Sequence, residues 1–264
     1  MSTLALYLLA GCTAGFFGGL LGIGGGLILV PALTILFAAQ QIAEPLVMPL
    51  ALGTSLASIV FTSLASVRAH HARGAVDWPL VRRMVPGLAT GAVLGAVLST
   101  RFSPEVLKLF FLAFAAAAAT QMLVGCRPQA TRALPGPAAM FAAGGAISCI
   151  ASLAGVGGAS MTIPFMAQCS VPLRSAIGSA SAMGLPIALA GVAGYAVNGL
   201  HMANLPPWCF GFIHLPALSA VAAGSVIAAP LGAALSHKLP VSALKGVFAL
   251  MMYAIAGKML VAVL

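Results

Sequence analysis

Two glycine-rich clusters interrupt apolar segments of the sequence in nearly the same way. Residues 15–31 read GFFGGLLGIGGGLILVP and residues 148–164 read SCIASLAGVGGASMTIP, so Pro31 and Pro164 occupy matching places. Glycine lets a backbone turn freely and lets a ligand approach its amide groups closely. A helix that restarts after such a break presents free N–H groups and a partial positive charge, which suits a small anion.

Glycine breaks in corresponding halves of a membrane protein are typical of a substrate site near the middle of the bilayer. We therefore predict that the two clusters form the tips of two helical hairpins and that an anion binds between them. Small hydroxyl side chains on neighbouring helices would add hydrogen-bond donors. The predicted substrate-binding residues are Gly22, Gly24, Gly25, Gly26, Thr54, Ser55, Gly155, Gly157, Gly158, Ser160 and Ser179.

Other small residues have a simpler structural explanation. Two sets of glycines repeat every four residues, namely Gly11, Gly15 and Gly19, and Gly87, Gly91 and Gly95. This spacing places each set on one helix face and favours close packing against another helix. Hydroxyl groups in membrane helices commonly bond back to their own backbone, and we expect this of Ser58 and Thr62.

The composition is that of an integral membrane protein. Of 264 residues, 61% are hydrophobic and only 6% are charged, whereas a soluble domain carries about 25% charged residues. Apolar segments that approach the ~20 residues of a membrane helix lie at 46–66, 84–98, 106–125, 175–196, 212–234 and 241–262. Because lipid offers the backbone no partner, and long runs show no strand-like alternation, we predict an all-α polytopic membrane protein.

The sequence divides into two similar halves. Residues 51–57 (ALGTSLA) match residues 176–182 (AIGSASA), and residues 85–88 (VPGL) are paired with residues 215–218 (LPAL). Each half is expected to hold one glycine-broken hairpin and three transmembrane helices. The predicted division of this single membrane domain is an N-terminal repeat at 1–125, a linker at 126–137 and a C-terminal repeat at 138–264.

The charge distribution indicates which way the two halves face. If each glycine-rich segment is a hairpin, the halves are inverted and nine of the twelve Lys and Arg residues lie on one side. If each is a single spanning helix, the halves are parallel and the split is seven to five. Lysine and arginine favour the cytoplasmic side, so the uneven split is preferred. This predicts inverted-topology repeats with both termini outside the cytoplasm, and it leaves open whether the hairpins span fully or are re-entrant.

The same residues carry a family resemblance. The segment GFFGGLLGIGGG at 15–26, the triplet Gly53-Thr54-Ser55 and the loop HHARGAVDW at 70–78 resemble the TauE/SafE family of sulfite exporters. The resemblance covers essentially the full chain and implies a bacterial membrane permease for sulfite, organosulfonates or related small anions. In the second half, Gly178-Ser179-Ala180 departs from the family's frequent Gly-Thr-Ser, so the two half-sites are chemically unequal.

Together these features predict a permease that exports a small sulfur-containing anion, sulfite or an organosulfonate, by alternating access in the cell inner membrane. A passive anion channel would use the same site without closing on both sides. A non-transporting scaffold or assembly factor is the third candidate, and it would tolerate bulky residues in the glycine clusters. The predicted partners are the anion and the lipid bilayer, and homo-oligomerisation stays open.

Several function classes are disfavoured. The formal charge of +9 does not indicate nucleic acid, because the Lys and Arg residues lie mostly in short connections. The five cysteines are scattered, so neither a metal site nor a cofactor is predicted, and no nucleophile–base cluster indicates an enzyme. Glu44, Asp77 and Glu105 fall at expected segment ends, which argues against carboxylate-coupled transport. His214 lies at an expected helix start and is interpreted as an interfacial residue.

Overall fold

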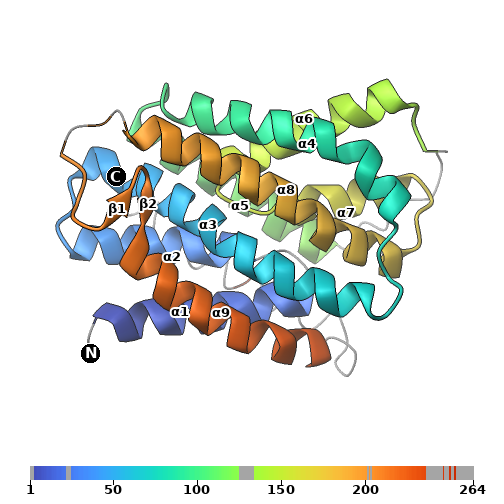
Figure 1. Cartoon of the computed structure of the whole chain (residues 1–264), viewed down its shortest axis with the longest axis horizontal. Coiled ribbons are helices and arrows are strands. Elements are labelled where there is room, and N and C mark those ends of the chain that lie inside the picture. Colours follow the sequence, from blue (N-terminus) through green and yellow to red (C-terminus); the bar gives the residue numbers. More distant parts are fainter. Residues whose placement is uncertain are drawn as a thin grey trace.

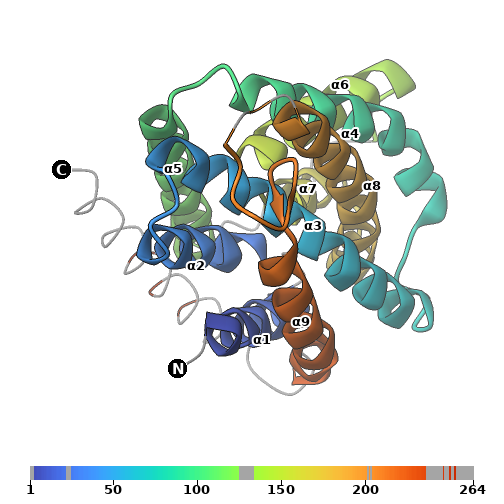
Figure 2. The same cartoon turned by 60° about the vertical axis from the view of Figure 1, so that its left-hand side comes forward.

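The protein is an assembly of long apolar helices, seen in the computed structural model of Figures 1 and 2. The structure describes residues 3–21, 25–124, 134–200, 202, 204–235, 246, 250 and 253. The helices in this part of the chain are α1 (Thr3–Leu21), α2 (Gly26–Ala39), α3 (Glu44–His71), α4 (Trp78–Ser99), α5 (Pro104–Val124), α6 (Pro137–Leu153), α7 (Ala159–Gln168), α8 (Leu173–Leu200) and α9 (Leu215–Leu235). A two-stranded antiparallel hairpin of β1 (Cys209–Phe210) and β2 (Ile213–His214) precedes α9.

Six of the described helices are long and apolar enough to cross a membrane, namely α1, α3, α4, α5, α8 and α9. The helices α2 and α6 are apolar but shorter, with 14 and 17 residues. The prediction of an all-α polytopic membrane protein is therefore confirmed. Five of the six predicted apolar segments coincide with these long helices. The sixth, 241–262, lies outside the described residues except for Gly246, Leu250 and Tyr253, which are helical.

Glycines bring the helices into backbone contact at two interfaces. A Cβ atom added to Gly15 on α1 would lie 2.5 Å from the Cα of Ser225 on α9, and Gly11 and Gly19 are equally close to α9. A Cβ atom added to Gly91 on α4 would lie 2.1 Å from the carbonyl oxygen of Gly145 on α6. The expected packing role of both glycine sets is confirmed, because no larger residue fits at either interface.

The two halves of the chain interlock through these interfaces. Helix α1 of the first half packs on α9 of the second half, and α6 of the second half packs on α4 of the first. The two 28-residue helices α3 and α8 pack against each other between these pairs. In Figure 1 the α3–α4 connection and the α8–α9 connection lie at opposite ends of the molecule. The buried core therefore has contributions from both halves.

Candidate functional site

Each glycine cluster breaks the helical path and starts a new helix with the same backbone conformation. Helix α1 ends at Leu21 and α2 begins at Gly26, while α6 ends at Leu153 and α7 begins at Ala159. The capping residue Gly25 has φ 71° and ψ −12°, and the matching Gly158 has φ 74° and ψ −8°. Both are left-handed conformations that favour glycine. The predicted residues Gly22 and Gly24 lie outside the described residues.

The starts of α2 and α7 are also hydrogen-bonded alike. The carbonyl oxygen of Gly25 accepts from the N–H groups of Ile28 and Leu29, each at 3.1 Å. The carbonyl oxygen of Gly158 accepts from Met161 and Thr162 at 3.0 and 2.9 Å. An α-helix leaves its first N–H groups without an intrahelical partner, and no side chain caps either helix here. Both helix starts therefore present backbone donors and partial positive charge.

The two breaks contact each other in the interior. A Cβ atom added to Gly26 would lie 2.7 Å from the carbonyl oxygen of Gly155, which itself has φ 65°. The Ser55 hydroxyl on α3 donates to the same Gly155 oxygen at 2.8 Å. A Cβ atom added to Gly157 would meet only the Ile59 side chain, at 3.3 Å. The structure thus brings together Gly26, Ser55, Gly155 and Gly157, and the Ser55 hydrogen is already engaged.

Three buried hydroxyl groups beside the second break have no hydrogen-bond partner among the described residues. They belong to Ser152 in the last turn of α6 and to Ser160 and Thr162 in the first turns of α7. Leaving a buried hydroxyl unpaired costs about 1–3 kcal/mol, so three together indicate a polar ligand or water at this place. Ser160 belongs to the residues predicted from the sequence, whereas Ser152 and Thr162 do not. Their positions in the sequence could have indicated them, because both lie within a few residues of the glycine cluster.

Thr54 and Ser179 occupy matched positions away from the breaks. The Thr54 hydroxyl oxygen accepts from the backbone N–H of His214 at 3.0 Å. The Ser179 hydroxyl oxygen accepts from the backbone N–H of Asp77 at 2.9 Å. Both hydroxyl residues are fully buried, and neither hydroxyl donates a hydrogen bond to another described residue. The described contacts therefore tie each residue to the start of a helix in the other half of the chain.

Asp77 and His214 are the side chains that cap those two helices, α4 and α9. The Oδ1 atom of Asp77 accepts from the backbone N–H of Leu80 at 3.0 Å at the start of α4. The Nδ1 atom of His214 accepts from the backbone N–H of Ala217 at 3.2 Å at the start of α9. His214 is only 8% exposed and packs inside the protein, while its position at the membrane interface stays a prediction. Its burial lowers the pKa of the imidazole.

This geometry also corrects one pairing between the halves. Pro216 is the second residue of α9, and Pro79 is the second residue of α4. Pro86, which the sequence pairing matched to Pro216, lies inside α4 instead. The pairing of residues 85–88 with 215–218 is therefore wrong. Proline suits the first turn of a helix, because its missing N–H would have no partner there. The two halves are therefore aligned by matching the capping residues Asp77 and His214, which places Pro79 opposite Pro216.

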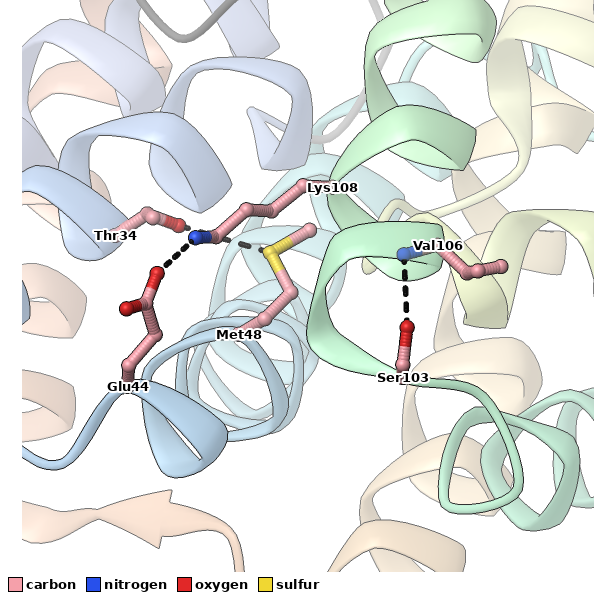
Figure 3. Close-up of polar contacts among 6 residues, drawn as sticks. All are labelled: Thr34, Glu44, Met48, Ser103, Val106 and Lys108. Carbon is pink, nitrogen blue, oxygen red and sulfur yellow. Dashed lines mark hydrogen bonds and ion pairs between the residues drawn. The ribbon is translucent and has the colours of Figure 1, made fainter. Parts of the chain in front are cut away.

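The acidic residues lie at helix starts rather than at the breaks. Glu44 is the first residue of α3, Asp77 caps α4 and Glu105 is the second residue of α5, as expected for segment ends. Figure 3 shows Lys108 reaching from α5 to Glu44, with 2.6 Å between Nζ and Oε1. The Lys108 side chain is 13% exposed and the Glu44 side chain 72% exposed. This pair joins α5 to the start of α3.

In the part of the chain that the structure describes, the site consists of hydrogen-bond donors without a nearby carboxylate. Around the breaks, the described residues provide backbone N–H groups and serine or threonine hydroxyls, and their carboxylates lie elsewhere. No group of three potential metal-ligating side chains occurs in the described ranges. Hydrogen-bond donors without a nearby carboxylate suit a small anion and repel no negative charge.

Comparisons with known proteins agree with a membrane transporter. The chain matches the family described as sulfite exporter TauE/SafE over residues 7–259. It is 34% identical over 255 residues to a probable membrane transporter protein of Haemophilus influenzae, covering 96% of this chain and 97% of that protein. A probable membrane transporter protein of Methanocaldococcus jannaschii is 24% identical over 240 residues, covering 89% and 87%. No solved structure matches the chain significantly.

Apolar helices, paired breaks and full-length matches to transporter proteins together define a multi-pass membrane transporter. More particularly, the chain belongs to the TauE/SafE sulfite exporter family. A further relative, the probable membrane transporter protein MamO of Paramagnetospirillum magneticum, is 28% identical over 291 residues. That match covers 95% of this chain but 43% of MamO, so MamO contains additional sequence.

Proposed function

We propose that the protein exports a small sulfur-containing anion, sulfite or an organosulfonate, by alternating access around a site between the two glycine breaks. The observation that carries the proposal is the set of three unpartnered buried hydroxyls, Ser152, Ser160 and Thr162, beside the uncapped start of α7. An oxyanion bound there would accept hydrogen bonds from these hydroxyls and from the free amides of the helix start.

The other predicted residues contribute to the proposed site in different ways. Gly25, Gly26, Gly155, Gly157 and Gly158 form or contact the breaks. An added Cβ atom would lie within 3.0 Å of a neighbour at each of them except Gly157, where it would lie 3.3 Å from Ile59. Thr54 and Ser179 stay predicted substrate ligands because each retains a hydroxyl hydrogen. Ser55 would reach the anion only if it released Gly155. Gly22 and Gly24 stay predicted members on the sequence pattern.

Alternating access would follow from an inverted-repeat architecture. We propose that residues 1–125 and 138–264 are inverted repeats joined by the linker at 126–137. The matched caps Gly25 and Gly158 and the matched pairs Thr54–His214 and Ser179–Asp77 support this symmetry. The α3–α4 and α8–α9 connections lie at opposite ends, as inversion requires. Rocking of one repeat against the other would then expose the breaks to each side in turn.

The direction of transport follows from charge. We propose that the protein lies in the inner membrane with both termini outside the cytoplasm, because this orientation puts most Lys and Arg residues inside. An interior-negative membrane potential favours outward movement of an anion by about 2.3 kcal/mol per charge per 100 mV. The described carboxylates lie away from the breaks, so the proposed export is driven by potential rather than by a carboxylate-bound coupling ion.

Flux into proteoliposomes tests this function. Purified protein should move radiolabelled sulfite or an alkylsulfonate with a saturable rate, and unlabelled anion on the opposite side should accelerate the exchange. Gly157→Leu should abolish flux, because Gly157 has an ordinary backbone conformation and a leucine there would fill the space beside Ile59. The matched control is Gly136→Leu, since a Cβ at Gly136 meets nothing within 4 Å.

Each other outcome has a definite meaning. Flux that rises linearly with concentration and shows no exchange would identify a passive channel. Full flux in a correctly folded Gly157→Leu protein would reject the site between the breaks. Flux of simple carboxylates but not of sulfur oxyanions would reject the substrate class.

A further inference from the structure

A cavity of about 540 Å³ opens at the end of the molecule where α1 begins. It lies between the start of α1, the α2–α3 connection and the segment around β1 and β2, on the left in Figure 1. The lining residues carry no formal charge, and they include the side chains of Tyr7, Gln40, Trp208 and His214. The cavity therefore combines apolar walls with a few neutral polar groups.

Tyr7 contributes a hydrogen-bond donor to this cavity. Its hydroxyl oxygen accepts from the side-chain amide of Gln40, so its own hydrogen has no acceptor among the described residues. The same Gln40 amide also donates to the carbonyl oxygen of Leu36 at 3.1 Å, which fixes its orientation. Tyr7 is 2% exposed, and its ring packs edge-on against Phe37. Its hydroxyl is thus held in place and still able to donate.

His214 contributes the second donor. Its Nδ1 atom accepts from the N–H of Ala217, so the neutral imidazole must carry its hydrogen on Nε2. His214 as a residue is 8% exposed, and its Nε2 atom forms no hydrogen bond with another described residue. The ring is held between Tyr7 and Phe37, with centroid distances of 6.1 and 5.3 Å. Two fixed, unused donors therefore line one cavity.

We propose that this cavity is a second binding site for a small oxyanion, in which the Tyr7 hydroxyl and His214 Nε2–H donate to the anion's oxygens. Neutral donors without a neighbouring cation bind an anion weakly enough to release it, which suits a site on a transport path. The apolar walls would also accept a short alkyl group, so an alkylsulfonate fits better than a metal ion or a sugar.

The site connects directly to the central breaks. The backbone N–H of His214 donates to Thr54 at 3.0 Å, and the next residue, Ser55, donates to Gly155 in the second break. Because α1 begins beside the cavity, the proposed orientation places it on the outer face. The choice of a sulfur oxyanion as the ligand of the cavity rests on the proposed function. The cavity would bind the exported anion in the step in which it leaves the protein.

Tryptophan fluorescence can test this site separately from transport. The chain has two tryptophans, and only Trp208 lines the cavity, whereas Trp78 begins α4. In a Trp78→Phe protein, titration with sulfite or ethanesulfonate should change the Trp208 emission saturably. Tyr7→Phe and His214→Asn should each raise the apparent Kd about 10-fold. The first removes one donor to a charged ligand, and the second displaces the other, because the shorter asparagine cannot place its amide where His214 Nε2 lies. Asparagine still caps a helix start, so His214→Asn keeps α9 capped.

The two proposals fail in distinguishable ways. Gly157→Leu should abolish flux and leave the Trp208 titration unchanged, because it alters only the central breaks. An unchanged Kd in both Tyr7→Phe and His214→Asn would overturn the cavity site, as would loss of the Trp208 response in Gly157→Leu. A saturable Trp208 response without flux in any assay would support the cavity as an anion site and reject the transport function. Thermal unfolding of each variant verifies that it is folded.

Discussion

The break between α1 and α2 and the break between α6 and α7 have the same backbone but different surroundings. Gly25 and Gly158 differ by only a few degrees in φ and ψ, and each accepts the first two hydrogen bonds of its helix. Around the second break lie Ser152, Ser160 and Thr162. Aligned on the prolines, the first half has Gly19, Leu27 and Leu29 at those places.

The two breaks therefore share one feature of the site and differ in another. The repeated feature is a helix start with free amides and a left-handed cap that favours glycine, and both halves keep it. The unrepeated feature is the set of hydroxyls, which only the second half supplies. An anion between the breaks would therefore receive amide donors from both sides but side-chain donors mainly from α6 and α7.

The largest effect should come from adding a methyl group at the two capping glycines. At Gly25 a Cβ would lie 2.6 Å from the backbone oxygen of Ala14, and at Gly158 it would lie 2.7 Å from the tip of the Ile187 side chain. Alanine at either position should lower the free energy of unfolding by about 1–2 kcal/mol, because of the left-handed backbone. Overpacking should lower it by about 1–3 kcal/mol more in Gly25→Ala. Thermal unfolding in detergent should show the larger loss for Gly25→Ala. Equal losses would mean that the α1 backbone moves away from the added methyl group as easily as the Ile187 side chain does.

Removing a hydroxyl beside the second break should lower the affinity for the anion without lowering the stability of the protein. Thr162→Val keeps the shape and removes an unpaired oxygen, so the free energy of unfolding should stay unchanged or rise by up to about 1–3 kcal/mol. The apparent affinity for the transported anion should fall about 10-fold at the same time. Unfolding and flux measured on one preparation would detect both changes.

Ser58→Ala is the matched control for Thr162→Val. The Ser58 hydroxyl is equally buried but bonds back to the carbonyl oxygen of Ser55 at 2.7 Å. Its loss should cost a little stability without changing anion affinity. If Thr162→Val destabilised the protein and left transport intact, the hydroxyl would be structural and the asymmetry between the breaks would have no functional meaning.

Much of the fold could be predicted because lipid leaves the backbone few choices. Helix positions, the glycine packing sets and the bonds of Ser58 and Thr62 to their own helix all follow from local sequence, and the structure confirms them. The roles of Thr54 and Ser179 could not be predicted this way. Their partners are 160 and 102 residues distant in sequence, and no local pattern encodes such contacts.

The start of α9 shows the same limit at a single residue. The apolar run at 212–234 suggested one continuous helix, but Phe212 to His214 lie in and beside a strand pair and α9 begins at Leu215. The helix starts there because His214 caps it, and the cavity exists because the preceding segment folds back over α1. Hydropathy cannot distinguish a buried strand residue from a buried helix residue.

The smallest predicted effect compares the two caps, since Asp77 is a carboxylate and His214 an imidazole. Burial lowers the pKa of His214 below its ordinary 6.5, so the unfolded chain binds a proton that the folded chain does not. Stability should therefore be greatest above pH 6.5 and decline as the pH falls through the lowered pKa. A cap contributes about 1 kcal/mol, which sets the scale of the decline. The neighbouring titratable groups, Tyr7 and Cys209, stay neutral there, and burial raises the pKa of the Cys209 thiol to about 11.

Replacing each of the two capping residues would test this comparison further. His214→Asn should flatten the decline between pH 7 and pH 5, because the amide caps α9 at every pH in that range. Asp77→His should add a second decline in the same direction, because a protonated imidazole at the start of α4 could no longer accept from Leu80. Unfolding midpoints measured in detergent across this range would separate the variants. An unaltered decline in His214→Asn would show that another group titrates and that the His214 cap is not sensitive to pH.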